Sequence, residues 1–367
     1  MSPAALTMTG VTDVVTARPD LGAGADLITV TRAWPRPRDG ELLISFEGRD
    51  RLGRVRAGLW TPGEARARVL PPGQDPAIPR PPGQDLTGEL LVHRYKRRMV
   101  LRRNGSGAST EYVKLLAGDR AGRVAEVSAA LAPVAAAAGF QVAPLTLRPG
   151  RVIAPALSGT TLTRWAATSS KPQRANGWAA AWLRWQEVWP VFAGGRAALP
   201  HWTVADECAT LDRWLADLLR LRPPDDAPMP HPPSVRARAR AATDALRALP
   251  EITAVPAHRD LHDGQLLWDG AGRLGLLDLD TGALADPALD LANLLTHLEW
   301  LHRLGHLDDA PHRTAHTAIT TVAGELGVDA ARLAAWSQAT RLRICAVHAF
   351  RPGTRQAAYR WLGELTG

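Results

Sequence analysis

Two carboxylates and one amide lie close together in the sequence, in a pattern that suits chemistry on phosphate. Asp260 and Gln265 belong to the run His-Arg-Asp-Leu-His-Asp-Gly-Gln at 258–265, and Asp278 follows thirteen residues later. Carboxylate and amide oxygens are ligands that Mg²⁺ accepts. Phosphoryl transfer depends on an aligned acceptor oxygen and on neutralised phosphate charge. We therefore expect Asp260 to orient or deprotonate an acceptor hydroxyl, while Gln265 and Asp278 hold Mg²⁺ on the phosphates of ATP.

A short hairpin is predicted between the amide and the second carboxylate. Apolar residues at 266–268 and 274–277 flank an Asp-Gly-Ala-Gly turn. Antiparallel pairing of these segments would bring Gln265 and Asp278 together. Two alternatives remain for the run at 258–265: an exposed polar turn, or a transition-metal site using His258 and His262, which have helical i, i+4 spacing. The following turn and strand argue against a helix there.

These motifs resemble those of the aminoglycoside phosphotransferase and choline kinase group. His258–Gln265 is similar to its catalytic loop, Asp278-Leu279-Asp280 to its metal-binding motif, and Ala285–Ala292 to its Gly-Asp-Pro-x-x-Asp-Leu-Ala motif. The resemblance covers about residues 89–367 and implies a protein-kinase-like fold and a small-molecule acceptor. It assigns supporting roles to six side chains, those of His258, Arg259, His262, Asp280, Asp286 and Asp290, with the last two holding the catalytic loop by hydrogen bonds.

Gln265 indicates a particular subgroup of this family, because most members of the group have Asn at this position. Gln after Gly264 is similar to the maltokinase and glucosamine kinase subgroup, whose members carry an N-terminal β cap. This implies a sugar or amino sugar as the acceptor. Three alternatives stay open: an antibiotic phosphotransferase, a non-catalytic nucleotide-binding protein, and a peptide kinase. Arg259 favours the last by completing His-Arg-Asp, and His262 opposes it.

The nucleotide site is expected in a small lobe before the catalytic loop. The resemblance implies an ion pair between Lys114 and Glu126, and an adenine-binding hinge at Pro155-Ala156-Leu157. The position of the phosphate-covering loop, 93–98, is rich in basic residues and lacks glycine. Its side chains either contact phosphates or form a solvated hairpin tip.

The element pattern predicts an α+β protein-kinase-like fold with two lobes. Alternating segments between 27 and 70 predict the N-terminal β cap (1–70), whose first 26 residues lack periodicity, and a proline-rich linker follows at 71–88. Strands and one helix, from about Arg123 to Ala138 with Gly139 as C-cap, predict a kinase-like N-lobe at 89–155. A mainly helical C-lobe is expected at 156–367. Its tryptophans at 178, 182, 185 and 189 form one helical stripe, which favours a core position over sugar stacking.

The composition indicates which binding partners and which cellular compartment to expect. The chain has 367 residues, 46% of them apolar, and a formal charge of +8. Its basic residues, nearly all arginine, are scattered rather than clustered, which favours a solvated surface over nucleic-acid binding. Cys208 and Cys345 have no metal-ligand spacing, the N-terminus lacks a signal-peptide pattern, and the longest apolar run is too short for a bilayer. We expect a cytoplasmic protein without nucleic-acid or membrane partners.

Overall fold

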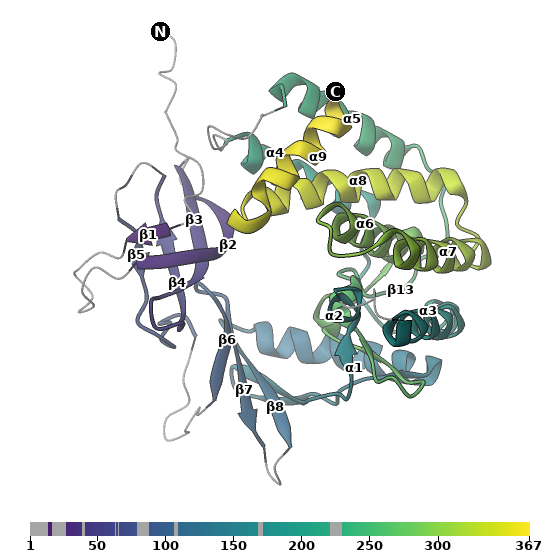
Figure 1. The fold of residues 1–367 in the computed structure, drawn as a ribbon, viewed down its shortest axis with the longest axis horizontal. Helices are drawn as coiled ribbons and strands as arrows, with labels where there is room; N and C mark the ends of the chain where they lie inside the picture. Colours follow the sequence, from purple (N-terminus) through teal and green to yellow (C-terminus); the bar gives the residue numbers. More distant parts are fainter. Residues whose placement is uncertain are drawn as a thin grey trace.

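The fold comes from a computed structural model with an N-terminal β cap and two lobes (Figure 1). The model describes residues 14–16, 27–38, 41–62, 64, 66–78, 88–105, 109–167, 172–220 and 230–367. The predicted α+β, protein-kinase-like architecture is confirmed. Apart from β1, the N-terminal arm predicted at 1–26 lies outside the described residues.

The cap is one antiparallel sheet with strands in sequence order. Its inward-facing residues form a small core that includes Ile28, Ile44, Phe46 and Trp60. The alternating pattern predicted the strands from Leu27 onward, but not β1, because side chains point to opposite faces at every second residue of a strand. The strands are β1 (Val14–Thr16), β2 (Leu27–Arg38), β3 (Glu41–Arg49), β4 (Val55–Trp60) and β5 (Arg68–Val69).

The N-lobe is a second sheet, of order β10-β11-β8-β7-β6, packed against helix α1. The helix ends at Gly139, which has a φ of 99° and caps the carbonyls of Ala135 and Ala136. This is the predicted C-cap, although α1 begins three residues before the predicted start. The elements are β6 (Glu89–Arg94), β7 (Arg98–Asn104), β8 (Thr110–Leu116), α1 (Arg120–Ala138), β10 (Thr146–Arg148) and β11 (Arg151–Pro155).

Part of the proline-rich segment expected as a linker is packed against the N-lobe. Asp75 is buried, and its carboxylate accepts hydrogen bonds from the Lys96 backbone N–H at 2.7 Å and lies 3.1 Å from His93 Nε2. Ile78 is buried with Met99 and Val113. The first Pro-Pro-Gly-Gln-Asp copy is therefore an anchored connector rather than a free spacer, because its side chains find partners. The second copy lies outside the described residues.

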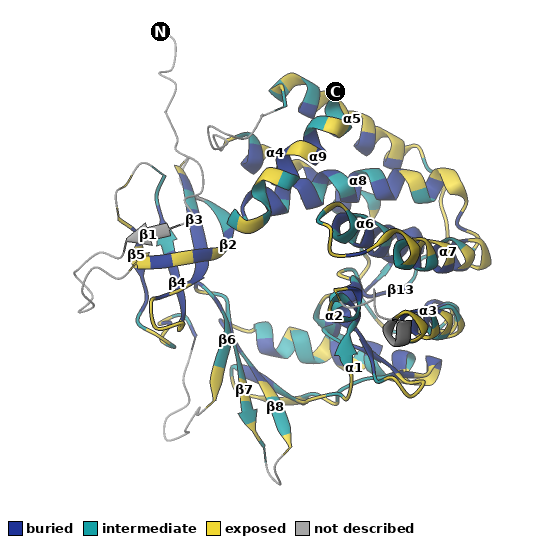
Figure 2. Ribbon diagram, in the orientation of Figure 1, coloured by how far each residue is buried: buried dark blue, intermediate teal, exposed yellow. Residues whose placement is uncertain are grey.

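The C-lobe is built of helices around one large core. The four tryptophans of the α3 stripe are all buried, with neighbouring ring centroids 5.6–5.7 Å apart, so the predicted core position is correct. Figure 2 shows the exposed faces of α5 and α7 turned outward. The helices are α2 (Leu162–Ala166), α3 (Pro172–Ala193), α4 (Val204–Leu219), α5 (Pro232–Arg247), α6 (Ala288–Arg303), α7 (Asp309–Glu325), α8 (Ala330–Ala349) and α9 (Arg355–Thr366).

Six short strands lie at the junction of the lobes. β12 (Thr160–Thr161), β14 (Leu266–Trp268) and β15 (Leu274–Leu276) form a sheet with β9 (Phe140–Gln141), and β13 (Val255–Ala257) pairs with β16 (Ala283–Ala285). β9 joins this sheet from just after α1. The strands hold the loops that carry the predicted catalytic and metal-binding residues.

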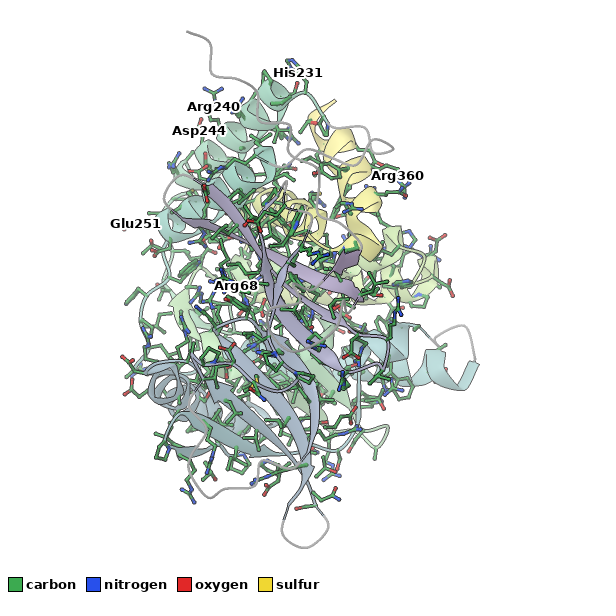
Figure 3. The ribbon with its side chains drawn as sticks, turned by 90° about the vertical axis from the view of Figure 1, so that its left-hand side faces the viewer. Arg68, His231, Arg240, Asp244, Glu251 and Arg360 are labelled. Atoms are coloured by element: carbon green, nitrogen blue, oxygen red, sulfur yellow. The ribbon has the colours of Figure 1, made fainter. Side chains whose placement is uncertain are left out.

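The cap contacts both lobes (Figure 1). On the N-lobe side, the Glu47 carboxylate accepts the His93 backbone N–H at 2.6 Å. On the C-lobe side, Phe350 follows α8 and is fully buried in the cap core, and its carbonyl accepts the Ala33 N–H at 3.1 Å. Seen from the cap side in Figure 3, Arg68 of β5 lies between the N-lobe below and the helices labelled at His231 and Arg360 above. The cap therefore connects the two lobes.

Among the residues that the structure describes, one helix has the length and apolar composition of a membrane span. It is α1, with a mean hydropathy of 1.2 over the 18 residues tested. Core helices of globular proteins pass the same test, and α1 packs against the N-lobe sheet and α3. α1 is longer than the apolar run that the sequence analysis considered too short to cross a bilayer.

Replacing Phe350 should weaken the attachment of the cap. Phe350→Ala removes a fully buried ring and should lower the free energy of unfolding by about 3–5 kcal/mol. Guanidinium denaturation measures this change. Leu52→Ala is the control, because Leu52 is 76% exposed in the same cap and should change stability by less than about 0.5 kcal/mol. Equal stability of the two variants would contradict this role for Phe350.

Acid should destabilise the C-lobe through His348. Burial, then the nearby charge of Arg351, lowers the pKa of His348 to about 3. The unfolded chain, with a histidine pKa near 6.5, therefore binds a proton that the folded chain excludes between about pH 3 and 6.5. Stability is unaffected above this window and falls as the pH drops through it, by about 2 kcal/mol from pH 7 to pH 5.

Thermal unfolding of the native protein and His348→Gln across pH 4–8 measures this loss. The variant should lose less stability on acidification. It retains a partial slope because burial also lowers the pKa of His297. Parallel curves for the two proteins would rule out His348 as a source of acid lability.

Candidate active site

A buried carboxylate holds the start of the predicted catalytic loop. Asp290, near the start of α6, accepts the backbone N–H groups of His258 at 2.6 Å and Arg259 at 2.8 Å. Arg259 has a φ of 67°, a left-handed conformation that non-glycine residues adopt at a cost. The guanidinium of Arg259 also lies 3.5 Å from the ring centroid of Trp202. Asp290 thus sets the loop backbone in the role that the resemblance implied for it.

His258 links this loop to the hairpin that follows. Its ring is fully buried, with Nε2 2.7 Å from the Leu277 carbonyl, and its Nδ1 faces the Asp260 N–H at 3.3 Å. Bonding to a carbonyl identifies Nε2 as the protonated nitrogen, which leaves Nδ1 as the acceptor. Asp260 itself is exposed. The loop therefore exposes the Asp260 side chain to solvent, while hydrogen bonds to Asp290 and His258 hold the loop backbone.

The hairpin brings Gln265 and Asp278 to adjacent positions, as predicted. Leu266 pairs with Leu276, and the Leu277 N–H donates to the Gln265 carbonyl at 2.9 Å. Asp278 has a φ of 57°, so the chain turns sharply immediately after the second strand. Gln265 and Asp278 both line the same cavity. Asp260 is not among the residues that line it.

The expected ion pair between Lys114 and Glu126 is wrong for this structure. Lys114 Nζ lies 2.5 Å from Asp278 Oδ1 and 2.7 Å from Asp280 Oδ2. Glu126 is exposed on α1 and has no ion pair within the described chain. The lysine is attracted to two partly buried carboxylates rather than one solvated carboxylate, since opposite charges interact more strongly away from water.

The pKa values of Asp278 and Asp280 shift in opposite directions. Burial acts to raise the pKa of Asp278, but the ammonium of Lys114 outweighs it and holds that pKa below its usual range. Burial and then the charge of Asp278 raise the pKa of Asp280 to about 6. The pKa of Lys114 is raised despite its burial, because both carboxylates favour the charged amine. Asp278 is therefore the more persistent anion of the pair.

A cavity of about 1010 Å³ lies between the N-lobe sheet, α1 and the β14–β15 hairpin. One part of its wall is apolar, with Leu157, Leu267 and Leu276, and another part carries Lys114, Gln265, Asp278 and Asp280. An apolar slot beside a charged end suits a nucleotide, which has a flat base and an anionic polyphosphate.

The expected hinge is only partly at this cavity. Pro155 and Leu157 line it. Ala156 does not, and its N–H is bonded to the Thr110 carbonyl at 2.9 Å, so this N–H is already engaged. The strand pairing of β8 with β11 uses this N–H because the two strands remain adjacent as far as Pro155.

The residues at the charged end are suited to Mg²⁺. Asp278, Asp280 and Gln265 present oxygen atoms to one part of the cavity wall, and hard divalent cations favour such ligands. The two aspartates approach closely enough to share one ammonium group. This concentration of negative charge also suits a divalent cation.

Other side chains support the loop, and some of them were not predicted. The Asp286 carboxylate pairs with Arg332 and accepts the Ala288 N–H at 2.9 Å, so it anchors α6 to α8 rather than contacting the loop. Asn293 was missed: its Nδ2 donates to the Arg259 carbonyl at 3.1 Å, and its Oδ1 accepts from Arg343 at 2.5 Å. Its position three residues after Asp290, on the same helix face, was the available signal.

His262 lies in a polar cluster with Asp263 and His297 rather than beside a second ligand from His258. Its Nδ1 accepts the Gly264 N–H at 3.0 Å, and its ring lies 4.9 Å from that of His297. His262, Asp263 and His297 place potential ligand atoms within 4.8 Å of one another, and Asp263 also accepts from Thr163. Because Nδ1 already accepts a hydrogen bond, Nε2 carries the proton of the neutral ring and is not free to bind a metal. The His258 and His262 metal pair is also excluded, because the His258 nitrogens are engaged within the loop.

The comparisons with known proteins agree with this geometry. Residues 89–319 match the phosphotransferase enzyme family. The chain belongs to this family. No curated protein matches the sequence.

Solved structures share the fold of this phosphotransferase. A thermostable mutant of the aminoglycoside phosphotransferase APH(4)-Ia, in its apo form, has a TM-score of 0.53 at 15% identity, covering 76% of this chain and 94% of that chain. Spectinomycin phosphotransferase in complex with ADP and spectinomycin has a TM-score of 0.51 at 10% identity, covering 76% and 88%. These structures show the shared fold. Membership of the phosphotransferase enzyme family identifies the chain as an ATP-dependent kinase with a hydroxyl acceptor, as the catalytic motifs predicted.

Loss of the Asp290 carboxylate should impair both folding and catalysis. Asp290→Ala leaves two backbone N–H groups unpaired, at about 1–3 kcal/mol each in unfolding free energy. Displacement of Asp260 should lower kcat by about 100-fold. Asp269→Ala is the matched control, because Asp269 also accepts two backbone N–H groups but in the distant hairpin turn. It should lose stability and retain kcat, and an equal fall in kcat for both variants would refute the positioning role of Asp290.

Proposed function

We propose that this phosphotransferase transfers the γ-phosphoryl group of Mg²⁺-ATP to a hydroxyl of a sugar or amino sugar. One observation carries the chemical part of the proposal. The hairpin and the catalytic loop place Gln265 and Asp278 at the charged end of the cavity, and Asp260 projects from the same loop. Phosphoryl transfer requires these three functions on adjoining surfaces.

Each residue has one task in this proposal. Asp260 accepts the proton of the acceptor hydroxyl or orients that hydroxyl toward the phosphate. Gln265 and Asp278 would hold Mg²⁺, which neutralises charge on the phosphates. Lys114 is positioned to exchange its contact with Asp278 for a phosphate oxygen, because both are anionic partners for one flexible ammonium. Pro155 and Leu157 contribute to the wall that receives the base.

The charges around Asp260 support a sugar over a polycationic drug. Arg259 precedes Asp260, and the partly buried Arg351 lies close enough for the charge of Asp260 to influence its pKa, which burial lowers to about 10. A polycationic acceptor would be repelled by these guanidinium groups. The Gln265 resemblance to maltokinase and glucosamine kinase points to the same acceptor class.

An antibiotic phosphotransferase is the second candidate. The similar structures include complexes with spectinomycin and with hygromycin B. The two candidates share the reaction and differ in the acceptor. An acceptor panel separates them directly.

Substitution of the proposed base should abolish acceptor-dependent turnover. Release of ADP from Mg²⁺-ATP is measured with monosaccharides, disaccharides, amino sugars, aminoglycosides and peptides. Asp260→Asn should lower kcat on the accepted sugar by about 100-fold to 10,000-fold, because the amide cannot take the proton. Asp244→Asn is the control, since Asp244 is exposed on α5 (labelled in Figure 3) and does not line the cavity.

The outcomes distinguish the candidates. Turnover of a sugar that depends on Asp260 supports the proposal. Turnover confined to aminoglycosides would replace it with the antibiotic alternative, and turnover confined to peptides would identify a peptide kinase. ATP binding with no turnover of any acceptor would favour a non-catalytic nucleotide-binding protein.

A further inference from the structure

Arginines from both lobes and the cap lie close enough together to influence one another's pKa values. They are far apart in the sequence, and the hairpin between β6 and β7 supplies half of them. The set, called here the arginine cluster, consists of Arg36 on β2, Arg94, Arg97 and Arg98 on the hairpin, Arg120 at the start of α1 and Arg213 on α4.

Strand register places two of these arginines directly opposite each other. Arg94 of β6 pairs with Arg98 of β7, and Val100 of β7 pairs with Lys114 of β8. Because Arg98 and Val100 are two residues apart, their side chains project from the same face of the sheet. Val100 and Lys114 line the cavity, so Arg94 and Arg98 share the cavity face. Like charges in directly opposed positions destabilise a sheet unless something compensates them.

The protein supplies little compensation. Across the described residues, no carboxylate forms an ion pair with Arg94, Arg97 or Arg98. The Nε atoms of Arg94 and Arg98 are buried and have no hydrogen-bond partner there. Arg94 lies over the ring of Trp34 at 4.6 Å, and Arg36 donates to the Ser45 hydroxyl at 3.2 Å. These contacts orient the guanidinium groups without neutralising them.

The electrostatic response agrees with a cluster of uncompensated cations. Burial, followed by the charges of Arg97 and Arg36, lowers the pKa of Arg94 to about 9. Burial and neighbouring arginines also lower the pKa of Arg97 and of Arg36. The charge of Arg98 contributes to the low pKa of Asp278. Arg98 is therefore the member of the cluster near the phosphate end of the proposed nucleotide site.

We propose that the arginine cluster is a binding site for a polyanionic, phosphate-bearing group, built jointly by the cap and the basic hairpin. The hairpin has no glycine between residues 93 and 98. The anion would therefore be held by guanidinium groups rather than by the backbone N–H groups of a glycine-rich loop. Two sources share this chemistry: the polyphosphate of the nucleotide, and an acceptor sugar that already carries a phosphate. The inference relies on the proposed function only for naming these two sources.

Binding measurements test the site without requiring turnover. Calorimetric titration of the full-length protein uses inorganic tripolyphosphate, Mg²⁺-ATP, adenosine, glucose and glucose 6-phosphate. Arg98→Gln and Arg94→Gln should each weaken tripolyphosphate binding by about tenfold, the equivalent of one lost charge-assisted contact. Arg103→Gln is the matched control, since Arg103 lies on the opposite face of β7 and pairs with Glu111. It should bind tripolyphosphate as the native protein does.

Thermal unfolding gives an independent readout. Without added anion, Arg98→Gln should unfold at a higher temperature than the native protein, because the opposed cation is gone. Tripolyphosphate should raise the unfolding temperature of the native protein more than that of the variant. Unchanged adenosine binding would show that the variant keeps its fold.

Further titrations identify the source of the anion. Weaker binding of Mg²⁺-ATP with unchanged glucose 6-phosphate binding assigns the cluster to the nucleotide, and the reverse assigns it to the acceptor. The inference is overturned if tripolyphosphate does not bind the native protein, or if the arginine variants bind it with native affinity. Loss of turnover in Asp260→Asn tests the proposed function separately, because that variant keeps the arginine cluster.

Discussion

The contact of Lys114 with Asp278 and Asp280 joins the N-lobe sheet to the C-lobe hairpin at the charged end of the cavity. Its strength comes from burial, since the three charged groups are partly withdrawn from water and must neutralise one another. The arrangement also explains why the pKa values of the two aspartates move apart. A cation and phosphates entering this site would compete with an ion pair that already exists. In the proposed function, nucleotide binding and the relation between the lobes would therefore be linked through Lys114.

A second connection between the lobes runs through the cap. Phe350 inserts into the cap core from the end of α8, while Glu47 of the cap holds the backbone of β6 at His93. The basic hairpin begins at that point. The position of the hairpin arginines thus depends on the cap, and Trp34 of the cap contacts Arg94 directly. In this fold the cap therefore helps to position the basic hairpin.

Several features followed from local sequence patterns. Period-2 alternation located the cap strands, the Gly139 C-cap located the end of α1, and the tryptophan stripe was correctly placed in the core. The hairpin joining Gln265 to Asp278 was predictable because turn residues and apolar flanks act over a few positions. Errors arose where the partner lay far away. Glu126 was chosen for Lys114 from an order of elements, whereas the geometry favoured carboxylates 164 and 166 residues away in the chain.

The sequence by itself determined the phosphotransferase family and its loop chemistry, because the motif residues lie within a few positions of one another. Only the tertiary structure decided the charge pattern around the site. Arginines scattered over nearly 180 positions, from Arg36 to Arg213, form one cluster, and Asn293 and Trp202 support Arg259 from other elements. The physical reason is that electrostatic interactions depend on distance in space. Sequence spacing does not report that distance once the cap, the hairpin and α4 fold together.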